Sequence, residues 1–240
     1  MNRAFAKNTA MNETGTPLLS GVHTWVFDLD NTLYPASQAL FPQIEARIGA
    51  FVSGHLGIGL AEARRLQKTY FREFGSTLRG LMTVHQTEPS NFLEFVHDID
   101  YGALAPDLRL DGALGRLAGR KFIYTNASAG HAERVTDRLG VSHHFEAVFD
   151  IEAAGYLPKP DPGPYGILTR SLAIDPKRAA MFEDIARNLA PAAAAGMTTI
   201  WLSGSPAWAS EGAGGDHIHH VAEDLPTWLE AVVAARFAAS

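Results

Sequence analysis

The sequence predicts an α/β protein in which helices flank a parallel sheet and an all-helical segment is inserted after the first strand. Short apolar runs rich in β-branched and aromatic residues alternate with runs whose apolar residues have helical spacing. Such alternation is typical of βαβ units, and therefore of a parallel sheet covered on both faces. Residues 36 to about 106 differ, because they show helical spacing without a convincing strand.

Each expected strand is a short apolar run, and the first one ends where acidic residues begin, at Asp28. We expect strands at residues 22–27, 121–125, 147–149, 179–182, 198–202 and 218–221. Helices of the sheet region are expected at residues 131–139, 164–172, 188–195 and 225–235. Asp224 is a suitable N-cap for the last helix, and Pro226 suits its first turn.

The inserted segment has a helical pattern throughout. Leu40, Ile44, Ile48 and Phe51 fall on one face of a helix expected at residues 38–56. Three further helices are expected at residues 60–74, 77–84 and 90–97. We therefore divide the chain into a flexible N-terminal tail (residues 1–20), an α/β core (residues 21–35 and 107–240) and a helical cap (residues 36–106).

The composition narrows the class of protein. Of the 240 residues, 46% are hydrophobic and 19% are charged, which indicates a folded globular chain. The net charge of −6 gives no support to a nucleic-acid partner, which usually meets a basic surface. The absence of cysteine excludes disulfides, thiolate catalysis and Cys-based zinc sites. No apolar run is long enough to span a membrane. We expect a cytoplasmic monomer or homodimer whose partner is a small molecule, not a nucleic-acid polymer or a membrane.

Two acidic residues, Asp28 and Asp30, follow the first strand. In an open parallel sheet, ligands bind outside the carboxyl ends of the strands. Two carboxylates this close repel each other unless a cation lies between them, and a hard cation such as Mg²⁺ prefers oxygen ligands. One carboxylate could then attack phosphorus while the other transfers protons. The alternative is an ordinary strand-to-turn junction, where Asp, Asn and Thr bond to the local backbone.

Polar residues also close the second strand and follow the third. Thr125 and Asn126 precede a helix that begins near Gly130, and a hydroxyl, an amide and backbone N–H groups at a helix entrance suit a phosphate. Ordinary helix capping is the alternative. Lys159 lies between two prolines that restrict its backbone, so its charge could be held beside a phosphoryl group. The alternative is a solvated lysine in a turn.

The fourth strand ends in paired acids, Glu183 and Asp184, which could bind Mg²⁺. The alternative has Asp184 as a helix N-cap and Glu183 on the surface. The four groups gain weight together, because the carboxyl ends of parallel strands lie at one edge of a sheet. They would supply a nucleophile, an acid/base, phosphate donors, a cation and metal ligands. Phosphoryl transfer needs this set, because positioning and charge stabilisation provide most of its catalysis.

Over residues 22 to 235 the sequence resembles the haloacid dehalogenase superfamily, in the branch with a helical cap after the first strand. The motifs that carry the resemblance are Phe27-Asp-Leu-Asp-Asn-Thr-Leu-Tyr34, Leu157-Pro-Lys-Pro160 and Phe182-Glu-Asp-Ile-Ala-Arg-Asn-Leu189. They match the family in order and spacing. The resemblance implies a Rossmann-like core and Mg²⁺-dependent hydrolysis of a small phosphorylated metabolite through an aspartyl-phosphate.

The resemblance also implies roles for single residues. Asp28 would be the nucleophile and a Mg²⁺ ligand. Asp30 would protonate the leaving oxygen, then activate water, and would bind the metal through its backbone carbonyl. Lys159 would bridge Asp28 and the phosphoryl group.

The remaining roles concern the second and fourth strands. Thr125 and Asn126 would hold the phosphoryl oxygens. Asp184 would ligate Mg²⁺, and Glu183 would help directly or through water.

A finer resemblance concerns the substrate. Residues 100–107 (Asp-Tyr-Gly-Ala-Leu-Ala-Pro-Asp) and the Asn-Thr-Leu-Tyr end of the first motif are similar to pyrimidine 5′-nucleotidases, which implies a nucleoside 5′-monophosphate phosphatase. The alternatives are a phosphatase of another small metabolite, such as phosphoglycolate or a sugar phosphate, and a phosphomutase.

Other functions fit the sequence less well. A dehalogenase does not use an acid at the position of Asp30. A phosphonate hydrolase needs a cap lysine, and Lys68 is the only lysine between residues 36 and 106. A non-enzymatic binding protein would not need the intact acidic set. An unrelated two-domain α/β receiver also has an acidic, Mg²⁺-binding Asp, but its phospho-aspartate persists. Such a protein would need neither the helical cap nor Asp30.

Overall fold

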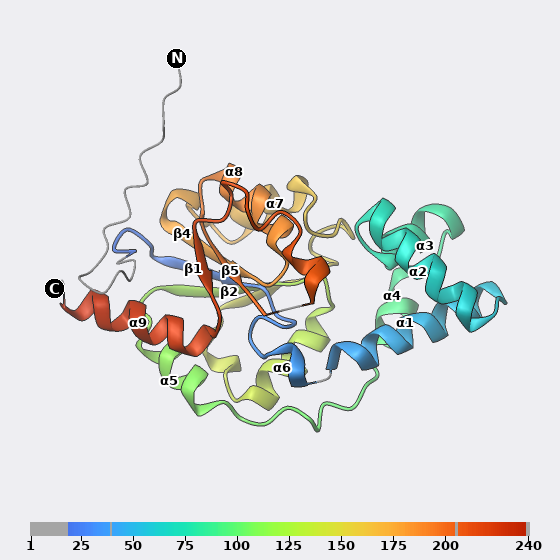
Figure 1. Cartoon of the computed structure of the whole chain (residues 1–240), viewed down its shortest axis with the longest axis horizontal. Helices are drawn as coiled ribbons and strands as arrows, with labels where there is room; N and C mark the ends of the chain where they lie inside the picture. The colour runs from blue at the N-terminus through green and yellow to red at the C-terminus, as the bar shows by residue number, and fades with distance from the viewer. Residues whose placement is uncertain (1–18, 39, 205, 239–240) are drawn as a thin grey trace, which may run out of the picture.

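The computed structural model describes residues 19–38, 40–204 and 206–238. Its centre is one sheet of six parallel strands in the order β3-β2-β1-β4-β5-β6 (Figure 1). The strands are β1 (Thr24–Phe27), β2 (Arg120–Tyr124), β3 (Ala147–Phe149), β4 (Ala179–Glu183), β5 (Thr198–Leu202) and β6 (His220–Ala222). The predicted α/β fold with a parallel sheet is therefore confirmed.

The central strand β1 is buried on both faces, which explains its continuous apolar sequence. Its side chains alternate between two hydrophobic clusters. Trp25 and Phe27 pack in one cluster, whereas Val26 packs in the other, on the opposite face of the sheet. Phe27 also stacks on Phe182 of the neighbouring β4, with ring centroids 4.6 Å apart. Phe27 and Phe182 are also register partners in the parallel pairing of β1 with β4, the two strands that carry the acidic residues.

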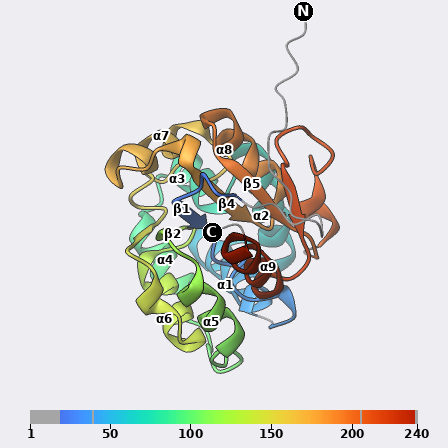
Figure 2. The same ribbon diagram turned by 90° about the vertical axis from the view of Figure 1, so that its left-hand side faces the viewer.

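Helices cover both faces of the sheet (Figures 1 and 2). On one face lie α5 (Leu108–Arg116), α6 (Ala129–Leu139) and α9 (Leu225–Ala238), and on the other α7 (Pro162–Ser171) and the short α8 (Ala190–Ala195). Helix α5 was not predicted from the sequence. It contains two glycines, but the Asp107 side chain accepts hydrogen bonds from two backbone N–H groups of its first turn, which starts the helix.

Between β1 and α5 the chain forms four helices: α1 (Leu40–Leu56), α2 (Leu60–Phe74), α3 (Thr77–His85) and α4 (Pro89–Val96). We call residues 40–96 the helical insertion. It lies beside the sheet in Figure 1 and has a hydrophobic cluster of its own, built around buried side chains that include Val52, Tyr70, Leu81 and Phe92. The four helices predicted here are confirmed within one or two residues at each end.

Several predicted boundaries were wrong for local reasons. Helices α6 and α7 begin two residues early because Ser128 and Asp161 cap them. The expected helix 188–195 is split into a 3-10 turn, Ala186–Leu189, followed by α8. The expected strand 218–221 is shifted to β6.

The predicted N-terminal tail falls almost entirely on residues 1–18, outside the described residues. Leu19 is buried in the cluster under α5, α6 and α9. Within the described ranges, no helix combines the length and the apolar character needed to cross a membrane.

Candidate active site

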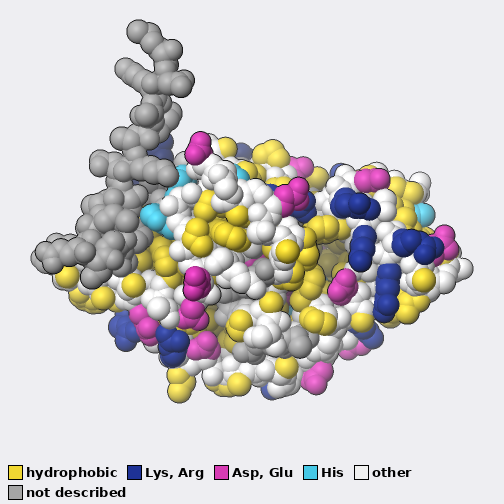
Figure 3. Space-filling view, viewed as in Figure 1, with side chains coloured by type: hydrophobic (Ala, Val, Ile, Leu, Met, Phe, Trp, Pro, Cys, Tyr) yellow, Lys and Arg dark blue, Asp and Glu magenta, His cyan; other side chains and the backbone are white. Residues whose placement is uncertain are grey.

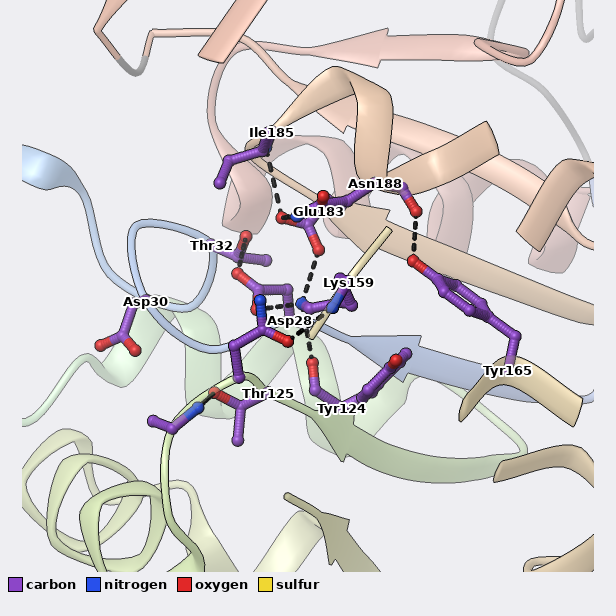
Figure 4. Close-up of polar contacts among 12 residues, drawn as sticks. Asp28, Asp30, Thr32, Tyr124, Thr125, Lys159, Tyr165, Glu183, Ile185 and Asn188 are labelled. Carbon is purple, nitrogen blue, oxygen red and sulfur yellow. Dashed lines mark hydrogen bonds and ion pairs between the residues drawn. The ribbon is translucent and has the colours of Figure 1, made fainter. Parts of the chain in front are cut away.

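The predicted polar residues gather at the carboxyl edge of the sheet (Figure 4). Asp28 follows β1, and its backbone N–H donates to the carbonyl of Phe182 at 2.9 Å, which extends the pairing with β4. Thr125 follows β2, and Glu183 is the last residue of β4. Lys159 comes from the loop between β3 and α7. The shared edge of the parallel strands therefore brings together residues that lie far apart in the sequence.

Lys159 is the centre of this group and is only 3% exposed. Its Nζ donates to Asp28 Oδ1 at 2.6 Å, to Glu183 Oε2 at 2.6 Å and to the carbonyl of Tyr124 at 3.0 Å. An ammonium group has three protons, and each of them has an acceptor here. The charge of Lys159 is thus held at a fixed place beside Asp28.

The charges of the site influence one another strongly. Burial raises the pKa of Asp28, although Lys159 opposes this effect. Burial and the charge of Asp28 together raise the pKa of Glu183. Burial disfavours the charge of Lys159, but Asp28 and Glu183 outweigh it and raise the pKa of Lys159. The lysine is therefore charged, and the carboxylates around it favour a further cation.

Asp28, Glu183 and Asp184 form an acidic group that could hold a divalent metal ion. All three are buried, and one carboxylate oxygen from each lies within 4.8 Å of the others. The donor set consists only of oxygen atoms, as Mg²⁺ prefers. Glu183 Oε1 also accepts from Asn188 Nδ2 at 3.1 Å and from the backbone N–H of Ile185 at 3.3 Å. Both oxygens of Glu183 therefore have protein donors, as both oxygens of Asp28 do.

Thr125 and Asn126 mainly organise the loops of the site. The backbone N–H of Ala127 donates to Thr125 Oγ1 at 3.0 Å. Asn126 Oδ1 accepts from the backbone N–H of Lys159 at 2.9 Å and so ties the lysine loop to the end of β2. The amide nitrogen of Asn126 can only donate, which suits an anionic ligand.

Asp30 lies to one side of the group formed by Asp28, Lys159 and Glu183 (Figure 4). Its Oδ1 accepts from the hydroxyl of Tyr34 and lies 2.9 Å from Nε2 of His131. Burial opposes ionisation of Asp30, but the two hydrogen bonds and the charge of His131 outweigh burial and lower its pKa to about 2.

Sequence reasoning missed several residues of the site. Thr32 donates to Asp28 Oδ2 at 3.0 Å, and Asn188 supports Glu183. Thr32 and Tyr34 belong to the first motif, so their proximity to Asp28 and Asp30 is a signal in the sequence. His131 lies 101 residues from Asp30, and no local pattern connects them.

A hollow of about 430 Å³ lies beside the lysine loop, between the helical insertion and the core. Pro158 and Pro160 form part of its wall, opposite Phe71 and Phe74 of α2, and three arginines also line it: Arg72, Arg79 and Arg187. Figure 3 shows Lys and Arg side chains gathered on the helical insertion. Helix α2 in particular exposes Arg64, Arg65, Lys68 and Arg72. Asp161 lines the hollow as well, so its wall combines three arginines and one carboxylate with apolar and aromatic side chains.

Comparisons with known proteins agree with this fold. The sequence profile of the haloacid dehalogenase-like hydrolases matches residues 22–196. The chain is 30% identical over 134 residues to Phosphate metabolism protein 8 of Saccharomyces cerevisiae. The aligned region covers 51% of this chain and 41% of that protein. It is 41% identical over 56 residues to Enolase-phosphatase E1 of Frankia alni, which covers 23% of each chain. The chain thus spans less than half the length of these curated relatives.

Among solved structures, the HAD phosphatase from Thermococcus onnurineus is similar in fold, with a TM-score of 0.60 and 16% sequence identity. The similarity covers 89% of this chain and 99% of that one. The family profile covers well over half of the sequence, including the ends of β1, β2 and β4 and the lysine loop. This chain therefore belongs to the haloacid dehalogenase-like hydrolase family.

Proposed function

We propose that the protein is a Mg²⁺-dependent phosphomonoester hydrolase that acts through an aspartyl-phosphate on Asp28. The observation that carries the proposal is the bond between Lys159 Nζ and Asp28 Oδ1 at the carboxyl edge of the sheet. It places a fixed positive charge beside a buried carboxylate, where both the nucleophile and an incoming phosphoryl group need neutralisation.

The proposed reaction has two steps. An Asp28 oxygen attacks phosphorus, the ester P–O bond breaks, and the departing oxygen takes a proton from Asp30. Water then attacks the phosphorus and gives a proton to Asp30, the bond to Asp28 breaks, and phosphate leaves. Lys159 neutralises phosphoryl oxygens in both steps, while Thr125 and Asn126 bind them.

Asp28 and Asp184 would hold Mg²⁺ through their carboxylates, Asp30 through its backbone carbonyl, and Glu183 directly or through water. A bound Mg²⁺ would supply positive charge beside the phosphoryl oxygens. The buried all-oxygen donor set of Asp28, Glu183 and Asp184 supports this assignment.

For the substrate we propose a nucleoside 5′-monophosphate, with the helical insertion acting as a cap over the site. The hollow between the insertion and the core supports this choice, because Phe71 and Phe74 could contact a base while Arg79 and Arg187 offer hydrogen-bond donors. The similarity of residues 100–107 to pyrimidine 5′-nucleotidases favours UMP and CMP.

The test is phosphate release from a panel of phosphomonoesters by purified protein with Mg²⁺. The panel contains UMP, CMP, AMP, GMP, sugar phosphates and phosphoglycolate. We expect hydrolysis, with UMP and CMP among the better substrates. Hydrolysis that excludes UMP and CMP would reject the substrate and leave the chemistry standing.

The nucleophile is tested with Asp28→Asn, which should remove activity and leave the fold intact. The matched control is Asp98→Asn, which makes the same change at an exposed residue paired with Arg47 and should retain activity. Normal turnover by Asp28→Asn would reject the mechanism.

A further inference from the structure

The carboxylate of Asp30 is the first member of a buried hydrogen-bond network. His131, on α6, places its Nε2 2.9 Å from Asp30 Oδ1, and its side chain has no exposed surface. On the other side of the ring, His131 Nδ1 lies 2.9 Å from the hydroxyl of Tyr101. The Tyr101 hydroxyl also lies 3.0 Å from the backbone carbonyl of His97.

The directions of these bonds follow from the number of hydrogens available. The carbonyl of His97 can only accept, so the single hydroxyl hydrogen of Tyr101 is donated to it. Nδ1 of His131 must therefore donate to the Tyr101 oxygen. Tyr101 thereby fixes the orientation of the imidazole and leaves Nε2 facing Asp30.

A second contact, on the face of the ring, also holds His131. The ring of His97 stacks on it, with centroids 4.5 Å apart and an interplanar angle of 21°. His97 is held in turn by Ser128, whose Oγ lies 2.9 Å from His97 Nδ1. The His131 ring therefore has a hydrogen-bond partner at each nitrogen and an aromatic neighbour on one face.

The network joins segments that are distant in the sequence. Tyr34 and Asp30 belong to the loop after β1, and His131 belongs to α6 of the core. His97 and Tyr101 follow α4, on the segment by which the chain leaves the helical insertion. The side chain of Asp30 is therefore tied to the connection between the insertion and the core.

We propose that His131, oriented by Tyr101, is a positioning residue that holds the Asp30 carboxylate in place for proton transfer to the leaving group. The inference rests on the proposed function, in which Asp30 is the acid/base. Both Tyr34 and His131 contact Oδ1 of Asp30, and no hydrogen-bond partner of Oδ2 occurs among the described residues. Oδ2 is thus the atom that exchanges the proton with the substrate.

Loss of the network should affect only the chemistry that needs the acid. An alkoxide leaving group, such as the 5′ oxygen of a nucleoside, is strongly basic and must be protonated as it departs. The p-nitrophenolate ion is weakly basic and can depart without an acid. General acid catalysis contributes about 10²–10⁴-fold to such steps.

The experiment compares kcat/KM of the whole 240-residue chain for p-nitrophenyl phosphate and for the best nucleoside monophosphate. This parameter includes only the steps up to departure of the alcohol, so hydrolysis of the phospho-aspartate does not contribute. We expect His131→Ala to lower kcat/KM for the alkyl ester by about 10²-fold or more, and for the aryl ester by less than about 10-fold. Asp30→Asn should show the same discrimination.

Three further variants make the test specific. His131→Gln can still donate an amide N–H toward Asp30, so it should restore part of the alkyl-ester activity. Tyr101→Phe removes only the hydroxyl that orients the ring of His131. It should lower kcat/KM for the alkyl ester more than for the aryl ester, as His131→Ala does, but by a smaller factor. His143→Ala changes an exposed histidine outside the network and should leave the ratio unchanged.

The outcomes separate this inference from the proposed function. If the wild-type protein hydrolyses no phosphomonoester, the proposed function fails. If the wild-type protein is active and His131→Ala lowers kcat/KM for both substrates by the same factor, His131 has only a structural role and the inference is overturned. Should His131→Ala not fold, Tyr101→Phe decides, because an unchanged substrate ratio in that variant contradicts the inference.

Discussion

Lys159 shows how single residues are balanced against one another in this site. A lysine is rarely buried this deeply unless its charge is paired, and here it contacts two carboxylates and a carbonyl. The carboxylates of Asp28 and Glu183 depend on Lys159 in turn, because without its charge two buried carboxylates would face each other. We therefore expect Lys159 to contribute to the stability of the fold as well as to the proposed chemistry.

Replacing Lys159 with Met should reveal this dependence. In chelator, Lys159→Met should lower the free energy of unfolding by about 3–5 kcal/mol, because it leaves buried charges without their partner. The double variant Lys159→Met/Asp28→Asn should recover part of the loss, since it removes one of the two facing charges. Urea denaturation followed by circular dichroism measures both.

The control is Lys68→Met, which changes an exposed lysine on α2 and should alter stability by no more than about 0.5 kcal/mol. Equal stability of Lys159→Met and Lys68→Met would contradict the account of Lys159 as a buried counter-ion.

At the scale of elements, the helical insertion depends on a close contact between α2 and α3. Gly80 of α3 lies against the ring of Tyr70 of α2, so closely that an added Cβ would fall 2.3 Å from Tyr70 Cγ. Tyr70 itself is buried in the cluster of the insertion. The glycine is therefore required by packing between the two helices.

Gly80→Ala should destabilise the insertion by about 1–3 kcal/mol, because the tyrosine ring must move to make room. Gly112 of α5 is the matched control, since nothing lies within 4 Å of the position of its added Cβ. Gly112→Ala should raise the free energy of unfolding by about 0.5–1 kcal/mol through the better helix propensity of alanine. Urea denaturation measures the change in the free energy of unfolding for both variants. A change of the same sign in Gly80→Ala and Gly112→Ala would contradict the packing argument.

At the scale of the whole molecule, the acidic group exists only when the strands are assembled. Asp28 follows β1, whereas Glu183 and Asp184 lie at the end of β4. An ion that binds all of them binds only the folded protein, and such a ligand stabilises the fold by an amount that grows with its concentration.

Mg²⁺ should therefore raise the thermal unfolding midpoint of the wild-type protein above its value in EDTA. At a free Mg²⁺ concentration of one hundred times its dissociation constant, the free energy of unfolding should rise by about 2.7 kcal/mol. Asp184→Asn should abolish most of this Mg²⁺-dependent shift, whereas Asp98→Asn should keep it. Differential scanning calorimetry with and without Mg²⁺ measures the shift, and EDTA should also abolish phosphatase activity. An undiminished shift in Asp184→Asn would reject that residue as a ligand.

The sequence by itself determined the class of fold and part of the set of polar residues at the sheet edge, including Asp28, Lys159 and Glu183. Alternating strand and helix patterns depend on neighbouring residues, so they can be read locally, and the acids that follow β1 and β4 mark the strand ends. Helix α5 was missed because its two glycines weaken the helical pattern, while its cap at Asp107 compensates for them.

Only the tertiary structure decided how these residues are paired. Asp28 and Lys159 are 131 residues apart, and Asp30 and His131 are 101 apart. Local patterns contain no information on such contacts, because they depend on the order of the strands and on where each loop returns to the sheet edge. For this reason the sequence could propose Asp30 as an acid/base, but only the fold showed that Asp30 contacts His131, which in turn contacts Tyr101.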